Sequence, residues 1–180
     1  FGEVEQLQVS LKGPANFVTA ADHRAEEILF TELSRARPGY SFLMEERGEI
    51  KGADATHRWI VDPLDGTTNY LHGFPQFAVS IGIRQGETLE QGVIYDPLRQ
   101  ELFTATRGSG AQLNNRRIRV SRRTDLDGAL VGTGFPHGDS TSLETFIRTY
   151  RSLFHATAGI RRAGAAALDL AYVACGRLDG

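Results

Sequence analysis

The chain has 180 residues, of which 41% are hydrophobic, and a formal net charge of −2. It is long enough to bury a core, no apolar run approaches the roughly 18 residues of a membrane span, and the balanced charge gives no general attraction to nucleic acid. The single cysteine, Cys175, excludes an internal disulfide and is expected to be a small buried thiol without a catalytic role. We therefore expect one cytoplasmic domain spanning residues 1–180.

The first predicted element is an amphipathic helix. Thr19 and Asp22 frame a sequence that resembles a capping box, and Arg37-Pro38-Gly39 ends the pattern. Between them, apolar residues recur at helical spacing at Ala25, Ile28, Leu29 and Leu33. The helix is followed by two short extended segments at residues 40–44 and 58–61, and carboxylates stand at the end of both.

The middle of the chain predicts a strand meander over residues 77–83, 91–95 and 101–105, with a tight turn at Asn114-Asn115. Residues 143–154 carry apolar side chains at helical spacing, and residues 165–175 form a more uniformly apolar helix that should be buried. Helices alternating with a mostly antiparallel sheet indicate an α+β fold in layers.

The most informative segment runs from Trp59 to Tyr70, where an apolar strand delivers Asp62 and Asp65 into a turn. Two carboxylates so close repel unless a cation joins them, and Mg²⁺ prefers oxygen ligands of this kind. Pro63 makes the turn rigid, and Gly66 lets the backbone approach a ligand. The amides of Gly66 and Thr67 would face an anion such as phosphate if a short helix begins there.

A plain surface turn is the alternative, because Asp, Pro and Gly each favour turns. The extension into Gly-Thr-Thr-Asn-Tyr, with Met44-Glu45-Glu46 closing the preceding strand, resembles the signature of the inositol monophosphatase family, in particular its bacterial SuhB-like branch. Further segments follow in the family's order: Lys12-Gly13, residues 17–22, residues 78–82, Tyr95-Asp96-Pro97, residues 107–111 and residues 164–169.

The resemblance implies a layered αβαβα sugar-phosphatase fold and a catalytic site with Mg²⁺. It makes Glu45, Asp62 and the carbonyl of Leu64 ligands of a first ion, and Asp62 with Asp65 ligands of a second. Asp22 would orient Thr67, which with Glu45 would position and deprotonate the attacking water. For the substrate, it implies contacts from Asp65, from the amides of Gly66 and Thr67 and from the backbone of Ala166. Lys12, Asn16 and Arg162 are weaker candidates, for an outer metal or for contacts with a partner.

The sequence departs from the family in two places. Ala165 stands where members commonly have Ser or Thr, which removes a hydroxyl near the ring pocket. Family members also continue beyond the position of Gly180 into a segment with a Trp-Asp pair whose carboxylate binds the second ion. They begin, in addition, with a further helix. We therefore expect the chain to be incomplete at both ends, with its C-terminal part missing and its second metal site weak or empty.

The resemblance leaves the substrate open. Inositol 1-phosphate or a similar polyol phosphate is the leading expectation, with lithium inhibition and a homodimer that uses residues 154–162. Fructose bisphosphate, adenosine bisphosphate, histidinol phosphate and NADP are alternatives, as is a SuhB-like role with RNA polymerase and Nus factors involving Arg161-Arg162.

Other kinds of site find little support in the sequence. The five histidines lack zinc-site spacing, and there is no Gly-x-Ser-x-Gly nucleophile elbow. The arginines at 116–123 alternate with Ile118 and Val120, a pattern typical of a solvated strand, so direct nucleic-acid binding is not expected.

Overall fold

A mostly antiparallel sheet of eight strands forms the centre of the computed structural model, which describes residues 9–13, 16–135 and 140–180. The strand order is β10-β9-β8-β7-β6-β5-β3-β4, and only β3 and β5 run parallel to each other. The strands are β3 Tyr40–Met44, β4 Gly48–Ile50, β5 Asp54–Asp65, β6 Ala78–Gln85, β7 Thr88–Asp96, β8 Glu101–Thr106, β9 Gly110–Leu113 and β10 Arg116–Arg117. This confirms the predicted α+β class and the strand meander.

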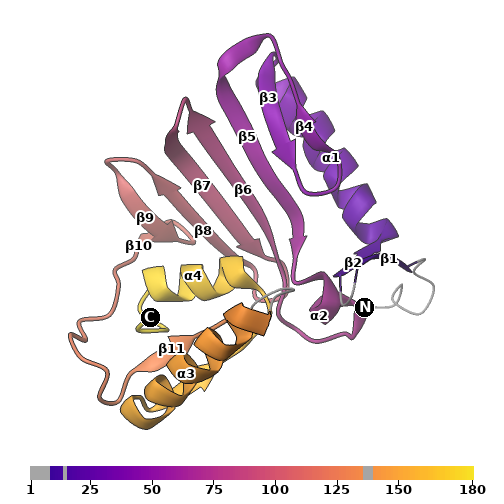
Figure 1. Cartoon of the computed structure of the whole chain (residues 1–180). Helices are drawn as coiled ribbons and strands as arrows, with labels where there is room; N and C mark the ends of the chain where they lie inside the picture. Colours follow the sequence, from indigo (N-terminus) through magenta and orange to yellow (C-terminus); the bar gives the residue numbers. More distant parts are fainter. Residues whose placement is uncertain (1–8, 14–15, 136–139) are drawn as a thin grey trace.

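One face of the sheet is covered by helix α1, Ala20–Ala36, which follows the hairpin of β1 Val9–Gly13 and β2 Asn16–Thr19 (Figure 1). The buried core on this face combines apolar residues of β3 and β5 with the helix: Phe42, Met44, Trp59 and Val61, packed by Leu29, Phe30 and Leu33. Two residues of the predicted apolar stripe therefore pack as expected, whereas Ile28 is 55% exposed.

The opposite face carries helix α4, Ala166–Ala174, near β6 and β7 (Figure 1). Its Leu168 is fully buried with Ala78 and Ala165, but Leu170 is 69% exposed. The expectation of a buried helix therefore holds for one side only. The rest of this sheet face forms a hollow of about 690 Å³ lined largely by apolar side chains, including Leu43 and Leu89.

A smaller two-stranded sheet lies in the C-terminal part of the chain. Its strands β11, Leu130–Gly132, and β12, Gly159–Arg161, are parallel, and helix α3, Ser140–Ala156, connects them. The C-terminal residue Gly180 lies beside β11, where its carbonyl accepts a hydrogen bond from the amide of Gly132 at 2.7 Å. Helix α3 leaves several apolar side chains exposed, namely Leu143, Ile147, Tyr150 and Phe154.

The arginine-rich segment differs from its prediction. β10 ends at Arg117, and residues 118–124 have no regular secondary structure, so the expected solvated strand is wrong beyond two residues. The arginines are exposed, as a solvated segment requires. Among the residues that the structure describes, no helix has both the length and the apolar character needed to cross a membrane.

The short element that matters most for the site lies at one end of the sheet. Helix α2, Thr67–Leu71, begins directly after β5, and its preceding residue Gly66 has a left-handed backbone with φ of 96°. The short helix on which the expected anion contact of Gly66 and Thr67 depends is therefore present. The turn at Asn114-Asn115 is also confirmed, with positive φ at both residues.

Candidate metal and phosphate site

The parallel pairing of β3 and β5 brings the first two candidate ligands together. Met44 lies opposite Val61, so Glu45 and Asp62 are the next residues on neighbouring strands at the same edge. The amide of Glu45 donates to the Val61 carbonyl at 3.3 Å. The carboxyl groups of Glu45 and Asp62 lie close enough for the charge of one to act on the other.

A bulge brings Asp65 to the same side of the sheet as Asp62. Side chains alternate along a strand, so residues three apart would normally point to opposite faces. Here Asp62 pairs with Ser80 and Asp65 with Ala78, which places two residues of β5 opposite one of β6. One of the two residues in the bulge is Pro63, which lacks an amide proton for the ladder. Asp62 and Asp65 therefore lie on the same side of the sheet only because the bulge interrupts the strand.

The carboxylates crowd each other electrostatically. Burial, followed by the charge and hydrogen bond of Glu45 and the charge of Asp65, raises the pKa of Asp62 to about 8. Burial also raises the pKa of Asp65, although the amides of Ala167 and Ala166 oppose this by donating to its carboxylate at 2.7 and 3.3 Å. Neutralisation by a cation would relieve this repulsion.

The donor set suits a hard cation. Within the parts of the chain that the structure describes, no three His, Cys, Asp or Glu side chains are grouped to hold one ion. The predicted ligands instead comprise two carboxylates for each ion. The carbonyl of Leu64 is a further ligand of the first ion. Mg²⁺ is bound in this way, through one or two carboxylates with further oxygens from water and substrate. The residues therefore fit the ion that the resemblance implies.

Asp22 and Thr67 meet as predicted. The Thr67 hydroxyl lies 3.0 Å from Oδ1 of Asp22, which is buried on α1, and also 3.0 Å from the carbonyl of Leu64. A hydroxyl has one proton, so it donates to one of these acceptors at a time. When Thr67 donates to Asp22, the Leu64 oxygen is free of that bond and can face a cation.

The remaining candidates lie in a second hollow of about 610 Å³. Asp65, Gly66, Thr67 and Ala166 line it, whereas Glu45 and Asp62 line the apolar hollow on the α4 face of the sheet. The predicted site is therefore divided between two adjacent hollows, with the bulge of β5 between them. Asp169 also lines the second hollow, and its pKa is raised by burial and by the charge of Asp65.

The weaker candidates have mixed outcomes. Arg162 lines the same hollow, with its guanidinium 4.7 Å from the centre of the Phe135 ring. The side chains of Lys12 and Asn16 lie outside the described residues. Ala165 is fully buried in the core, so its missing hydroxyl is at a packed position.

Asn69 joins helix α2 to two loops around the site, a role that sequence reasoning missed although it quoted the motif. Its side-chain amide nitrogen donates to the carbonyl of Gln76 at 2.7 Å and to that of Ala163 at 2.8 Å. An added Cβ at Gly164 would lie 2.9 Å from the same nitrogen. Asn69 therefore fixes α2 against the segment that leads into α4, whose first amides hold Asp65.

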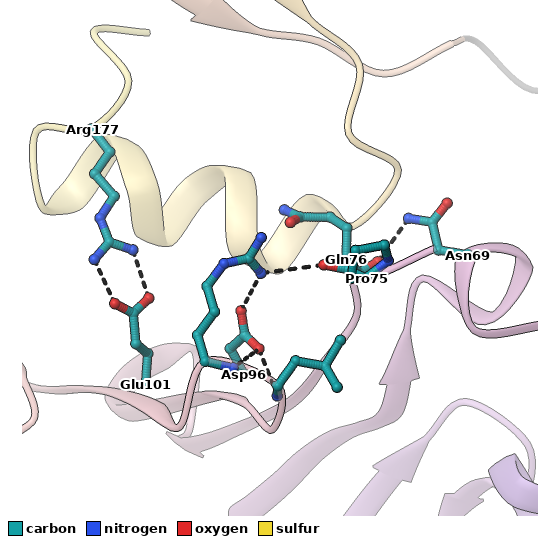
Figure 2. A network of polar contacts seen from close by, with 8 residues as sticks. Asn69, Pro75, Gln76, Asp96, Glu101 and Arg177 are labelled. Carbon is teal, nitrogen blue, oxygen red and sulfur yellow. Dashed lines mark hydrogen bonds and ion pairs between the residues drawn. The ribbon is translucent and has the colours of Figure 1, made fainter. Parts of the chain in front are cut away.

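A polar network supports these loops from the sheet side (Figure 2). Fully buried Asp96 accepts from the amides of Leu98 and Arg99, and the Arg99 guanidinium contacts both Asp96 at 2.7 Å and the carbonyl of Pro75 at 3.3 Å. Arg177, after α4, makes a two-pronged ion pair with Glu101 of β8. The network thus links α4 and the 72–77 loop to the end of β7 and the start of β8.

Glu26 is the other residue that sequence reasoning missed. It is a buried carboxylate on α1, one turn after Asp22, and it accepts hydrogen bonds from the turn that follows Glu45. Its spacing of four residues from Asp22 was a signal that the two share one helix face.

The chain is similar in sequence and in fold to several known proteins. An inositol-1-monophosphatase of Mesorhizobium japonicum is 56% identical over 180 residues, which cover 100% of this chain and 68% of that protein. A Nus factor SuhB of Pseudomonas aeruginosa is 50% identical, with 99% and 69% covered. The crystal structure of the extragenic suppressor protein suhB from Bartonella henselae matches with a TM-score of 0.95 and 56% identity, over 98% of this chain and 68% of that one.

These relatives and the layered sheet define the class: a phosphatase of the sugar-phosphatase fold. The chain belongs to the inositol monophosphatase family, whose sequence model matches residues 1–180. It spans about two thirds of the length of the relatives named above. The predicted family and fold class are therefore confirmed.

Proposed function

We propose that this protein is a Mg²⁺-dependent phosphate monoester hydrolase acting on inositol 1-phosphate or a similar polyol phosphate. The observation that carries this proposal is the proximity of Glu45 and Asp62 at the end of the parallel strands β3 and β5. The bulge in β5 then brings Asp65 to the same place. Relatives named inositol-1-monophosphatase, at 51 to 56% identity, support the choice of substrate.

In this proposal, Glu45, Asp62 and the Leu64 carbonyl hold a first ion, and Asp62 and Asp65 hold a second. Asp65 already accepts two amide hydrogen bonds, but a carboxylate offers about four lone-pair sites, so room for a cation remains. When bound, Mg²⁺ supplies positive charge to the attacking and leaving oxygens of the displacement at phosphorus.

The chain's own groups then manage the water and the phosphate. Asp22 accepts a hydrogen bond from the Thr67 hydroxyl, so that the hydroxyl oxygen can orient a water by accepting a hydrogen bond from it, while the Glu45 carboxylate would take the proton of that water. The amides of Gly66 and Thr67 precede the first intrahelical bond of α2, Tyr70 to Gly66, and so remain available for phosphate oxygens. Because α2 has five residues, this contribution comes from two amide groups more than from a helix dipole.

The alcohol part of the substrate would occupy the hollow beside these groups, against the backbone of Ala166. The Ala166 amide donates to Asp65 at 3.3 Å, which aligns the start of α4 with the proposed second ion. Arg162 stands at the same hollow as a further polar contact.

Phosphate release from a panel of esters tests the proposal. Inositol 1-phosphate, fructose bisphosphate, adenosine bisphosphate, histidinol phosphate and NADP are each compared at saturating Mg²⁺ and in excess chelator. We expect Mg²⁺-dependent release, fastest from inositol 1-phosphate, and inhibition by lithium. Asp62→Asn should lower kcat by orders of magnitude with the fold retained, because it removes ligand charge.

Asp125→Asn is a matched control, since Asp125 is exposed, lies outside the proposed site and makes a 4.0 Å contact with Arg123. It should leave turnover unchanged. Near-normal turnover in Asp62→Asn at saturating Mg²⁺ would show that the assignment of this ligand is wrong.

A second candidate function is a partner role with RNA polymerase and Nus factors. It is favoured by relatives named Nus factor SuhB at 47 to 50% identity and by the exposed Arg161-Arg162 pair. Binding of purified Nus factors that survives Asp62→Asn but is lost on substitution of both arginines would establish this role independently of catalysis.

We also propose that residues 1–180 belong to one domain and that the protein forms a homodimer. One sheet carries α1 on one face and α4 on the other, which supports a single unit. The exposed apolar residues of α3, together with residues 154–162, offer a surface for a second copy. A monomer mass in light scattering at micromolar concentration would contradict the dimer.

A further inference from the structure

Glu26 is a buried carboxylate outside the proposed catalytic and metal-binding set. Its side chain is 1% exposed on the inner face of α1, four residues after Asp22. A carboxylate is costly to bury unless hydrogen bonds and an opposite charge compensate it.

The compensation comes from one turn. Oε1 of Glu26 accepts the amide of Glu46 at 2.9 Å and that of Arg47 at 3.3 Å, and Oε2 lies 3.4 Å from Nε of Arg47. The Arg47 side chain also pairs with Glu27 and lies 5.0 Å over the Phe30 ring. These contacts attach the β3–β4 turn to α1.

The residue immediately before these two amides is Glu45. Its own amide is bonded to Val61 of β5, so its backbone is fixed by the sheet on one side and by Glu26 on the other. Without the second attachment, the backbone after Glu45 could rotate, and the carboxylate would no longer be held toward Asp62.

We propose that Glu26 is a positioning residue that holds the Glu45 carboxylate in its metal-binding orientation. This inference rests on the proposed function. In this arrangement, α1 serves both sides of the site from one face: Asp22 holds Thr67, and Glu26 holds the turn after Glu45.

The test measures Mn²⁺ binding by calorimetry in the whole protein, with amide hydrogen exchange of Glu46 and Arg47 as a second readout. Glu26→Met keeps the length of the side chain but removes the acceptor. We expect about 10- to 100-fold weaker binding of the metal, as for other residues that support ligands, and faster exchange of both amides. The Mg²⁺ concentration for half-maximal activity should rise in parallel, with KM for the ester changed less than about twofold.

Glu26→Gln keeps an oxygen acceptor and should restore most of the metal affinity. Glu27→Gln is the matched control, because it removes the exposed partner of Arg47 and leaves the two amide bonds in place. If Glu26→Met does not fold, Glu26→Asp takes its place: it withdraws the oxygens by one methylene and should also weaken binding at least tenfold.

The outcomes separate the two proposals. Wild-type protein that neither binds Mn²⁺ nor releases phosphate with Mg²⁺ overturns the proposed function and this inference with it. Wild-type binding together with unchanged affinity in a folded Glu26→Met or Glu26→Asp protein overturns only the role of Glu26.

Discussion

Removal of the Asn69 side chain should destabilise the protein by about 2 kcal/mol. Its amide nitrogen donates to Gln76 and Ala163, and each such hydrogen bond contributes about 1 kcal/mol net. Figure 2 shows the bond to Gln76. Asn69 lines an open hollow, so water can reach the abandoned carbonyls and keep the loss near this value. The melting temperature should fall by roughly 4 to 8 °C for a chain of this size.

Urea unfolding of Asn69→Ala measures this free energy directly. Thr68→Ala, at an exposed position of the same helix, is the control and should stay within about 0.5 kcal/mol of wild type. Asn69→Asp should destabilise more than Asn69→Ala, because it places a carboxylate oxygen against two carbonyls at the same positions. A loss below about 0.5 kcal/mol for Asn69→Ala would refute the view that this amide joins helix α2 to the two loops.

Two further predictions concern the loops and the sheet. Gly66→Ala should destabilise by about 3 kcal/mol in urea unfolding, since φ is 96° and the new Cβ would lie 2.8 Å from the Gln76 carbonyl; wild-type stability would contradict this. The hydrogen bond from Arg177 lowers the pKa of Glu101 below its ordinary value of 4.5, so this pair stabilises above pH 4.5 and stops doing so as pH falls through the lowered pKa. The stability difference between wild type and Glu101→Gln should therefore shrink from pH 7 to pH 3, and a constant difference would exclude the pair as its source.

Much of the fold could be predicted because its patterns are local. The capping residues and the Pro-Gly stop place α1 closely, and alternating apolar residues place the meander. β3 is found over the same residues as predicted, whereas β5 is much longer, at Asp54–Asp65. Its extension includes Pro63 and the three aspartates Asp54, Asp62 and Asp65, residue types that strand propensity does not favour.

The candidate site depended on pairing between strands, which a single sequence does not display. The contact of Glu45 with Asp62 comes from the parallel register of β3 and β5, and the placement of Asp65 comes from a bulge. The sequence indicated the ligand types through the motif but gave no reason for their convergence.

The burial of individual charged and apolar residues was the least predictable feature. Glu26 is a charged residue of the kind expected on the surface of α1, but it is buried, because its carboxylate oxygen accepts a hydrogen bond from the amide of a turn distant in the chain. Leu170 belongs to an apolar helix but is 69% exposed, because α4 covers only part of the sheet. Both outcomes depend on packing between elements distant in the chain.

Anomalous diffraction from crystals of the whole protein soaked in Mn²⁺ tests the central claim most directly. We predict a peak between the carboxylates of Glu45 and Asp62, within about 2.0 to 2.3 Å of oxygens from both and of the Leu64 carbonyl. The peak should disappear in Asp62→Asn crystals. A protein that hydrolyses phosphate esters with Mn²⁺ while showing no peak at this position, or a peak that persists in Asp62→Asn, would contradict the account.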